Sequence, residues 1–444
     1  MRRYWLMKAG AACATVGLLI FLAGCGAGEA QPSEITRLPP TTKLKVLGHA
    51  TWFKSGWNAL VKDAALHGFE LEVETVPDTP SGNDLIQTRF ATRDTPDILL
   101  YFPGILLRDF GPPSELFVKQ EDQPWMANLD KDAWAGALDD AETPDGLVRG
   151  YYAVPYWGSN GSVILYNKKV FKAYSLNIPK TYAEFLHICE TLKQMNVTPV
   201  YYSGKDAWTL QLLVFNAASK RGYHVLVDKI NANQAKFTEY VNFKRGLEVM
   251  LELKNKSYIN ADYLSGTYDS AQKALATGKA GMYPMATWVM NDISEKYPDQ
   301  VNDIGAFILP FDGDETDVVP VFAPYGMFVP KGKNQEAAQK FVNYFASIDT
   351  QNLYFAHEGG IPALKGVVQK KLTPAEADVK RDMDAGRSLA NWQYAMKYNS
   401  GDLPAYIMDV LVGGKTTEQV LSAMDKEFAK DAKANGDPIF LGSR

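Results

Sequence analysis

The segment Val154–Phe171 reads VPYWGSNGSVILYNKKVF and places two aromatic rings directly before a glycine-rich turn. Tyr156 and Trp157 are adjacent, and the small polar stretch Gly158–Gly161 follows them. The apolar run 163–166 comes next and predicts a strand. Glycine absorbs changes in φ and ψ at little steric cost, and hinge residues must absorb such changes. The segment therefore predicts either a loop whose rings join the core or a hinge that carries the rings into a cleft.

Strands and helices alternate on both sides of this segment. Residues 44–47 and 69–76 have strand patterns, and the amphipathic stretch 57–66 lies between them. The short apolar run 97–102 predicts a buried strand, and the alternation resumes after residue 171. Such alternation is typical of a mostly parallel sheet with helices on both faces, so the predicted fold class is α/β.

The N-terminus has the pattern of a secretory signal. The only charges before residue 29 are three basic residues in the first eight positions. Residues 9–24 are small or apolar, a run too short for a bilayer span. The sequence LAGC (22–25) resembles the bacterial lipobox, in which the signal is cut before the cysteine and its sulfur takes a diacylglyceryl group. An ordinary signal peptide with a chance cysteine is the alternative. We expect a signal peptide over 1–24, a lipid on Cys25 and a flexible tether over 25–42.

The cysteine count and the net charge indicate a protein without an internal disulfide that does not bind nucleic acid. Of three cysteines, Cys13 lies in the signal and Cys25 would carry lipid, which leaves Cys189 and no internal disulfide. The length of 444 residues suffices for two or more domains with their own cores. Loss of the signal removes three of 46 basic residues and none of 51 acidic ones, so the mature net charge is −8. Nucleic-acid binding is not expected.

Several stretches look like motifs of common enzymes or metal sites, but each departs from the required pattern. The GGKTT stretch has Asp409 where a phosphate loop needs its first glycine. Within GSNGS, Asn160 occupies the position of a nucleophilic serine. Five histidines are scattered, and the acidic stretch 312–317 lacks the calcium-loop pattern. We expect no cofactor, no metal site and no enzymatic activity, although sequence alone does not exclude a facing pair of carboxylates.

Five stretches resemble one family in order along the chain. They are ATRDTPDILLY (91–101), YAVPYWGSNGSVILYNKKVF (152–171), GKAGMYPMATWVMNDI (278–293), VPKGKNQEAAQKFVNYFASIDTQNLYFAHEGGIPAL (329–364) and GGKTTEQVL (413–421). Together they resemble the extracellular solute-binding lipoproteins of ATP-driven sugar importers, the group that includes maltose-binding protein. Each motif alone is weak, but five in order behind a lipobox are specific.

The resemblance implies two α/β lobes with the solute between them. Carried to this sequence, the first lobe comprises 41–155 and 305–370, and the second comprises 156–304 and 371–444. Crossings near 155, 304 and 370 would form the hinge. The implied function is a monomeric receptor, lipid-anchored on the outer face of the cell membrane, that captures a carbohydrate and delivers it to an ABC permease.

Aromatic rings suit a sugar site because one face of a pyranose is a patch of C–H groups. The resemblance assigns ring-stacking positions to Trp288, Tyr101 and Trp208, and Tyr101 also ends a strand at the edge where α/β sheets bind ligands. Trp288 and Tyr101 are expected to share one gap. Trp52 and Phe53 follow the first strand at the same kind of edge.

Other candidates complete the expected ligand set. Tyr156 and Trp157 would line the cleft wall, Asp206 would bond hydroxyls, and Tyr325 follows the second crossing. Asn160 falls where maltose-binding protein has a carboxylate. The stretch 391–410 departs from the family pattern; it holds several rings, of which Tyr406 is favoured, with Asp402 as a polar partner.

Three alternatives remain open from the sequence. The same fold could bind an acidic sugar or a peptide, and an excess of Arg and Lys in the cleft would support the acidic sugar. An anchored glycoside hydrolase would turn over an oligosaccharide. A sensor subunit without transport would differ only in its partner.

Overall fold

The computed structural model describes residues 41–442 apart from 54, 78–79, 105–106, 108–109, 131–138, 144–145, 312–315 and 370–371. The expected signal peptide, Cys25 and nearly all of the tether lie outside the described residues. None of the helices in the described ranges is both long enough and apolar enough to cross a membrane.

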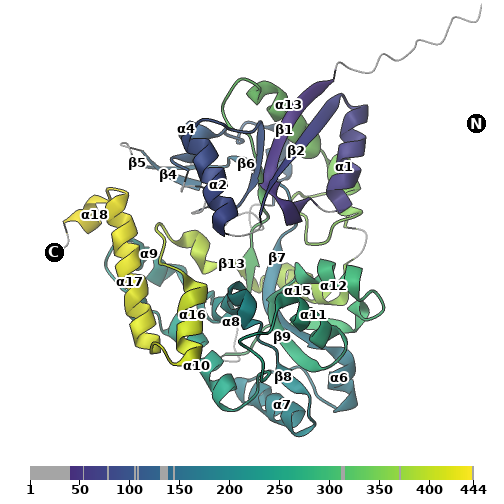
Figure 1. Ribbon diagram of the computed structural model, residues 1–444, viewed down its shortest axis with the longest axis vertical. Coiled ribbons are helices and arrows are strands. Elements are labelled where there is room, and N and C mark those ends of the chain that lie inside the picture. Colours follow the sequence, from purple (N-terminus) through teal and green to yellow (C-terminus); the bar gives the residue numbers. More distant parts are fainter. Residues whose placement is uncertain are drawn as a thin grey trace, which may run out of the picture. The chain divides into compact units, whose positions relative to one another are not determined.

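The first lobe is built on a five-stranded sheet of order β2-β1-β3-β12-β6, of which β1, β2 and β6 are labelled in Figure 1. Its strands are β1 (Thr42–His49), β2 (Phe69–Val76), β3 (Ile98–Tyr101), β6 (Ala153–Pro155) and β12 (Gly326–Phe328). All are parallel except β12, which runs antiparallel to β3 and β6. Its helices are α1 (Ser55–Leu66), α2 (Pro80–Ala91), α4 (Pro113–Leu116), α13 (Gln335–Phe345) and α14 (Ile348–Phe355). A separate hairpin, β4 (Asp139–Thr143) and β5 (Gly146–Gly150), belongs to the same part of the chain.

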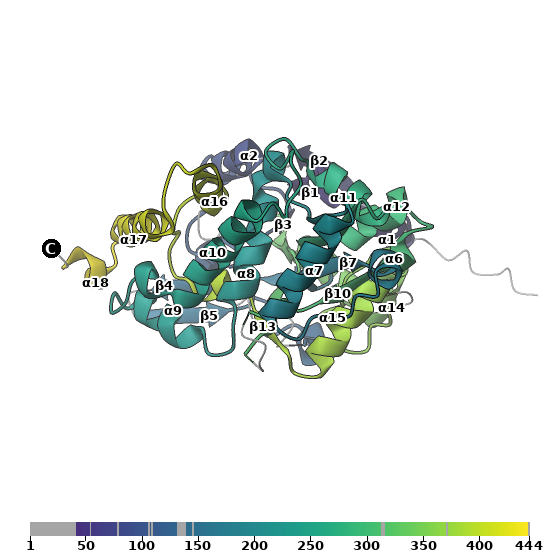
Figure 2. The ribbon, with the colours of Figure 1, turned by 90° about the horizontal axis from the view of Figure 1, so that it is seen from below.

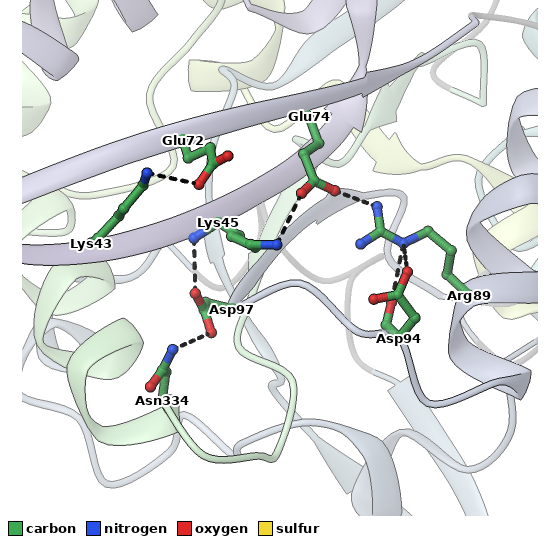
Figure 3. Close-up of polar contacts among 8 residues, drawn as sticks. All are labelled: Lys43, Lys45, Glu72, Glu74, Arg89, Asp94, Asp97 and Asn334. Carbon is green, nitrogen blue, oxygen red and sulfur yellow. Dashed lines mark hydrogen bonds and ion pairs between the residues drawn. The ribbon is translucent and has the colours of Figure 1, made fainter.

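Charged side chains cover the outer strand of this sheet (Figure 3). Lys43 of β1 pairs with Glu72 of β2 at 3.2 Å, and Lys45 pairs with Glu74 at 3.6 Å. Arg89 of α2 also bonds to Glu74. Exposed pairs of this kind add little stability. Their charges do discourage the free edge of β2 from pairing with another strand.

The second lobe is built on a six-stranded sheet of order β13-β11-β7-β9-β8, with β10 also paired to β7. Its strands are β7 (Asn160–Asn167), β8 (Thr198–Val200), β9 (Ala280–Ala286), β10 (Ile304–Phe307), β11 (Val319–Phe322) and β13 (Ser388–Ala390). Both β9 and β11 run antiparallel to β7. The sheet is therefore mixed rather than mostly parallel.

Helices surround the second sheet (Figure 2). They are α6 (Lys168–Ala173), α7 (Tyr182–Gln194), α8 (Gln211–Ala218), α9 (His224–Asn231), α10 (Val241–Asn255), α11 (Tyr268–Ala276), α12 (Val289–Lys296), α15 (Pro374–Asp384), α16 (Leu403–Val412), α17 (Thr417–Ala434) and α18 (Pro438–Leu441). Among these, α7, α8, α11 and α15 contact the strands directly. Thr181 and Thr416 cap α7 and α17 by accepting bonds from the third residue of each helix, and in α17 the Gln419 side chain completes a capping box.

Each sheet has its own hydrophobic core. The residues in these two cores show that the second crossing is not where the sequence predicted it. Ile304, Phe307 and Val321 belong to the second core, whereas Ala323 and Met327 belong to the first. The second crossing therefore lies near 323 rather than 304. The reason is that β10 and β11 pair with β7 before the chain returns to the first sheet.

Backbone hydrogen bonds join the crossing segments to one another. The Tyr156 N–H donates to the Tyr325 carbonyl at 2.7 Å, which links the first and second crossings. Ser159 and Ile361 exchange two bonds of 2.7 and 3.0 Å, which link the first crossing to the loop after α14. At the second link a Cβ on Gly158 would lie 2.4 Å from the carbonyl carbon of Gly360. Only glycine at position 158 permits this approach.

We expect Gly158→Ala to lower the free energy of unfolding by about 1–3 kcal/mol, because the added methyl overlaps the Gly360 backbone and neither backbone has a flexible end that can yield. Gly332→Ala is the control, since a Cβ there meets nothing within 4 Å. Urea unfolding followed by circular dichroism measures both. Equal effects of the two substitutions would contradict the close crossing.

Candidate ligand-binding site

In each sheet, the carboxyl ends of several strands lie along one side, here called the edge of the sheet. In the first sheet, Gly326 at the start of β12 pairs with Tyr101 and Pro155, the last residues of β3 and β6. In the second, Asn160 at the start of β7 pairs with Phe322, the last residue of β11. The carboxyl ends of β1, β3, β6, β9 and β11 thus lie at these two edges.

Short connections hold the two edges close together. Four residues, 156–159, separate β6 from β7, and three residues, 323–325, separate β11 from β12. An extended chain spans at most about 3.6 Å per residue, so these ends lie within about 18 Å of each other. Side chains that follow the strands at either edge are therefore positioned to meet one ligand.

Three rings from separate segments form a stack at the first edge, here called the Tyr325 stack. The Tyr325 ring packs against Trp52 and Trp157, with ring centroids 4.1 and 4.6 Å away and interplanar angles of 25° and 29°, and the two indole centroids lie 6.3 Å from each other. Phe102 meets Trp52 and Tyr325 edge-on at 5.0 and 4.8 Å. Trp157, Tyr325 and Phe102 are half-buried, whereas Trp52 is buried, so the first three rings are the ones suited to stacking on a ligand.

Three predicted ligand residues of this lobe belong to its core instead. Tyr101, Tyr156 and Trp52 are 1%, 0% and 2% exposed. The Tyr156 hydroxyl donates to the Trp52 carbonyl at 2.9 Å. Tyr101 and Trp288 therefore do not share a gap: Tyr101 packs in the first core, and Trp288 packs against the second. Phe53 is half-buried and meets Trp57 edge-on at 5.0 Å.

A second group of rings lies at the edge of the second sheet. Half-buried Trp288 follows β9, with its ring 5.1 Å from Phe322 and 6.4 Å from Trp208. Trp208 is 40% exposed and lies 5.2 Å from Tyr268. The predicted pair Trp208 and Trp288 thus comes together. Phe322 and Tyr268 were not foreseen, although Phe322 lies three residues before the predicted Tyr325.

Asp206 supports this group through the backbone. Its carboxylate accepts the Tyr268 N–H at 2.7 Å, at the start of α11. The Tyr268 hydroxyl donates to Asp292 at 2.8 Å. Burial, then the negative charge of Asp292, raises the pKa of Tyr268, and Tyr325 of the first lobe adds to the effect. Asp206 therefore fixes the Tyr268 ring beside Trp208, in addition to any contact with a ligand.

The side-chain amide of Asn160 makes hydrogen bonds to other groups of the protein. Its amide donates to the Gly158 carbonyl at 2.8 Å and accepts from the Thr287 hydroxyl at 3.1 Å. The Gly161 N–H also reaches the Thr287 oxygen at 3.2 Å. This arrangement ties the start of β7 to the residue before Trp288. In this structure Asn160 thus orients the hinge and the indole, and its predicted bond to a sugar hydroxyl would compete with these contacts.

In the C-terminal aromatic stretch 391–410, Tyr394 rather than the favoured Tyr406 lies at the second crossing. Asp402 is exposed and caps α16 by accepting the Ala405 N–H at 3.2 Å. Tyr406 is half-buried, with the Lys415 ammonium 5.3 Å from its ring centroid. Tyr394 instead packs against the first core and hydrogen-bonds the Ala323 backbone, and burial raises its pKa. Helix α16 does contact the Gly204–Leu210 turn that carries Trp208, so a role for Tyr406 stays a prediction.

Comparison with known proteins indicates the same family as the five sequence motifs. The family model described as "Bacterial extracellular solute-binding protein" matches residues 50–352. The "Multiple sugar-binding protein" of Streptococcus mutans is 24% identical over 388 residues, which cover 84% of this chain and 86% of that protein. Among solved structures, a "Chitin oligosaccharide binding protein" has a TM-score of 0.72 at 19% identity and covers 88% of this chain and 99% of its own. The "SBP RafE in complex with raffinose" has a TM-score of 0.69 at 19% identity, with coverages of 87% and 99%. The chain belongs to the bacterial extracellular solute-binding proteins.

Proposed function

We propose that this protein is the lipid-anchored receptor of an ABC sugar importer, which captures a mono- or oligosaccharide between the two sheet edges and delivers it to the permease. The observation that carries the proposal is the pair of ring groups, Trp157 with Phe102 on one edge and Trp288 with Trp208 on the other. Flat apolar rings match the C–H faces of pyranoses. The ligand changes the balance between open and closed forms because it contacts both lobes at once.

The charges beside the rings favour a neutral ligand over an acidic one. Asp206 and Asp292 lie next to the Trp208 group, and each accepts a bond from Tyr268. An acidic sugar would bring a third negative charge to this group. Of nearby cations, Lys205 is exposed, so solvent screens its charge. We propose that the ligand carries no net negative charge and that the protein breaks no bond in it.

A thermal-shift screen tests the ligand class. A neutral oligosaccharide at 100 times its dissociation constant is expected to add about 2.7 kcal/mol of stability and raise the melting temperature. Uronic acids and peptides are expected to give no shift. A response to uronic acids alone would overturn the neutral class, and chromatographic detection of cleaved oligosaccharide would overturn the non-enzymatic role.

Trp288→Ala is expected to weaken sugar binding about thirtyfold, because removal of an anchoring indole costs about 2 kcal/mol. Isothermal titration with the best sugar from the screen measures the change. Tyr297→Ala is the matched control, since it removes a half-buried ring just beyond the other end of α12. An unchanged dissociation constant in Trp288→Ala would remove this indole from the site.

Cys25→Ser tests the anchor. We expect the substitution to move the protein from the membrane fraction to the medium or periplasm, because a serine hydroxyl takes no thioether-linked lipid and stable attachment needs acyl chains. Immunoblots of fractionated cells measure the distribution. A variant that stays with the membrane would show that attachment depends on another feature of the chain.

A further inference from the structure

Helix α12 carries an indole and a carboxylate on the same face where it begins. Trp288 is the N-cap of α12, with helical φ and ψ of −55° and −28°, and Asp292 lies four residues later in the first turn. Side chains four residues apart share one face of a helix, with Cβ atoms about 5–6 Å apart. Both residues are half-buried, whereas Val289 and Met290 between them are buried in the core. One sugar unit can therefore contact the ring and the carboxylate together.

Two observations place the first turn of α12 in the part of the second lobe that faces the first lobe. A Cβ on Gly359, in the loop after α14, would lie 2.1 Å from the side-chain oxygen of Asn291. The Tyr268 hydroxyl, which donates to Asp292 at 2.8 Å, is within electrostatic reach of Tyr325. Burial is the main cause that raises the pKa of Tyr268, and the proximity of Asp292 and of Tyr325 adds to it. Asp292 therefore lies close to the side of the second lobe on which the Tyr325 stack is found.

The Asp292 carboxylate is held in one orientation by Tyr268. The phenol ring lies 5.2 Å from Trp208, and the Tyr268 N–H donates to Asp206 at 2.7 Å, so the ring itself is fixed. Its hydroxyl reaches Oδ2 of Asp292. A carboxylate offers about four acceptor positions, and an oriented carboxylate offers them in defined directions. Such a group binds a sugar hydroxyl in a matching position without the cost of ordering a side chain, a distinction that a stacking ring alone does not make.

A second carboxylate on the same pair of helices has a structural place instead. Asp269 of α11 pairs with Lys296 at 2.6 Å, and 74% of its side chain is exposed. Lys296 is the last residue of α12, eight residues after Trp288, which is about 12 Å along the helix. Lys296 also donates to Gln272 of α11 at 3.1 Å. These bonds tie α11 to α12 away from the indole, so Asp269 is a matched control for Asp292.

We propose that Asp292 is a specificity-determining residue of the sugar site: its carboxylate accepts hydroxyl groups of the sugar unit that stacks on Trp288. The inference rests on the proposed function and adds to it a polar contact that the sequence did not predict. Hydrogen bonds from hydroxyls to a carboxylate are charge-assisted and stronger than bonds between neutral groups. A site with such an acceptor discriminates against an analogue that lacks the hydroxyl, because the half-buried carboxylate then loses a donor.

Isothermal titration with deoxy sugars tests the contact. The probes are the neutral oligosaccharide that gives the largest thermal shift, called the parent sugar, and its monodeoxy derivatives. The unmodified protein is expected to bind at least one derivative about thirtyfold more weakly than the parent sugar. Asp292→Asn is expected to bind the parent sugar about tenfold more weakly and that derivative with an unchanged dissociation constant, because the derivative has no hydroxyl to lose a partner. Asp269→Asn is expected to change neither dissociation constant.

Tyr268→Phe separates direct contact from support of the neighbouring ring. This variant keeps the carboxylate beside Trp288 and loses only the hydroxyl that orients it. We expect it to bind the parent sugar about threefold more weakly and to keep a preference of more than about tenfold over the deoxy derivative. If Asp292 acted only by holding Tyr268, Asp292→Asn would keep the same preference as Tyr268→Phe, and that result overturns the inference.

The inference and the proposed function fail in different ways. If the parent sugar binds but Asp292→Asn keeps the selectivity of the unmodified protein against every monodeoxy derivative, the inference is overturned and the proposed function stands. An equal loss of binding in Asp269→Asn and Asp292→Asn also overturns the inference, since it would show a general effect of charge. If the unmodified protein binds no sugar, both are overturned. Should Asp292→Asn not fold, Asp292→Ser is expected to show the same loss of selectivity.

Discussion

The two-lobed arrangement depends on a contact between two backbones. Gly158 of the first crossing and Gly360 of the loop after α14 lie so close that a Cβ on Gly158 would be 2.4 Å from the Gly360 carbonyl carbon. The paired bonds of Ser159 and Ile361 keep them there. Since the chain passes between the sheets at this point, the contact decides how near the sheet edges lie. The rings that follow the strands can act together only because these passages are short.

Local sequence predicted the elements well, because their signals are local. The alternation in 69–76 and the apolar face of 57–66 correspond to β2 and α1. Local sequence could not decide which of two adjacent rings faces the core. Tyr101 and Tyr156 are buried, whereas their neighbours Phe102 and Trp157 are half-buried. In a strand buried on both faces, such as β3, no polar alternation marks the outer side, so the register is fixed only by pairing with distant strands.

Polar residues were harder to assign for a related reason. Asp206 and Asn160 were expected to bind sugar hydroxyls, yet their partners in the protein are 62 and 127 residues away in sequence. A carboxylate or amide beside a ring has the same appearance in sequence whether it contacts a ligand or supports the ring. The second crossing was misplaced by the same kind of long-range effect, because β10 and β11 return to β7 before the chain leaves the second sheet.

Two kinds of side chain, aromatic rings and buried carboxylates, have different roles in the proposed capture of a ligand. Rings at the edges offer broad, weakly directional contact, which suits a ligand that arrives in many orientations. Buried carboxylates at Glu358 and Glu376 make directional bonds to backbone N–H groups, which suits a part that must return to one geometry. Glycine at position 158 permits the close passage of the first crossing, and the carboxylates of Glu358 and Glu376 fix the loop that it passes.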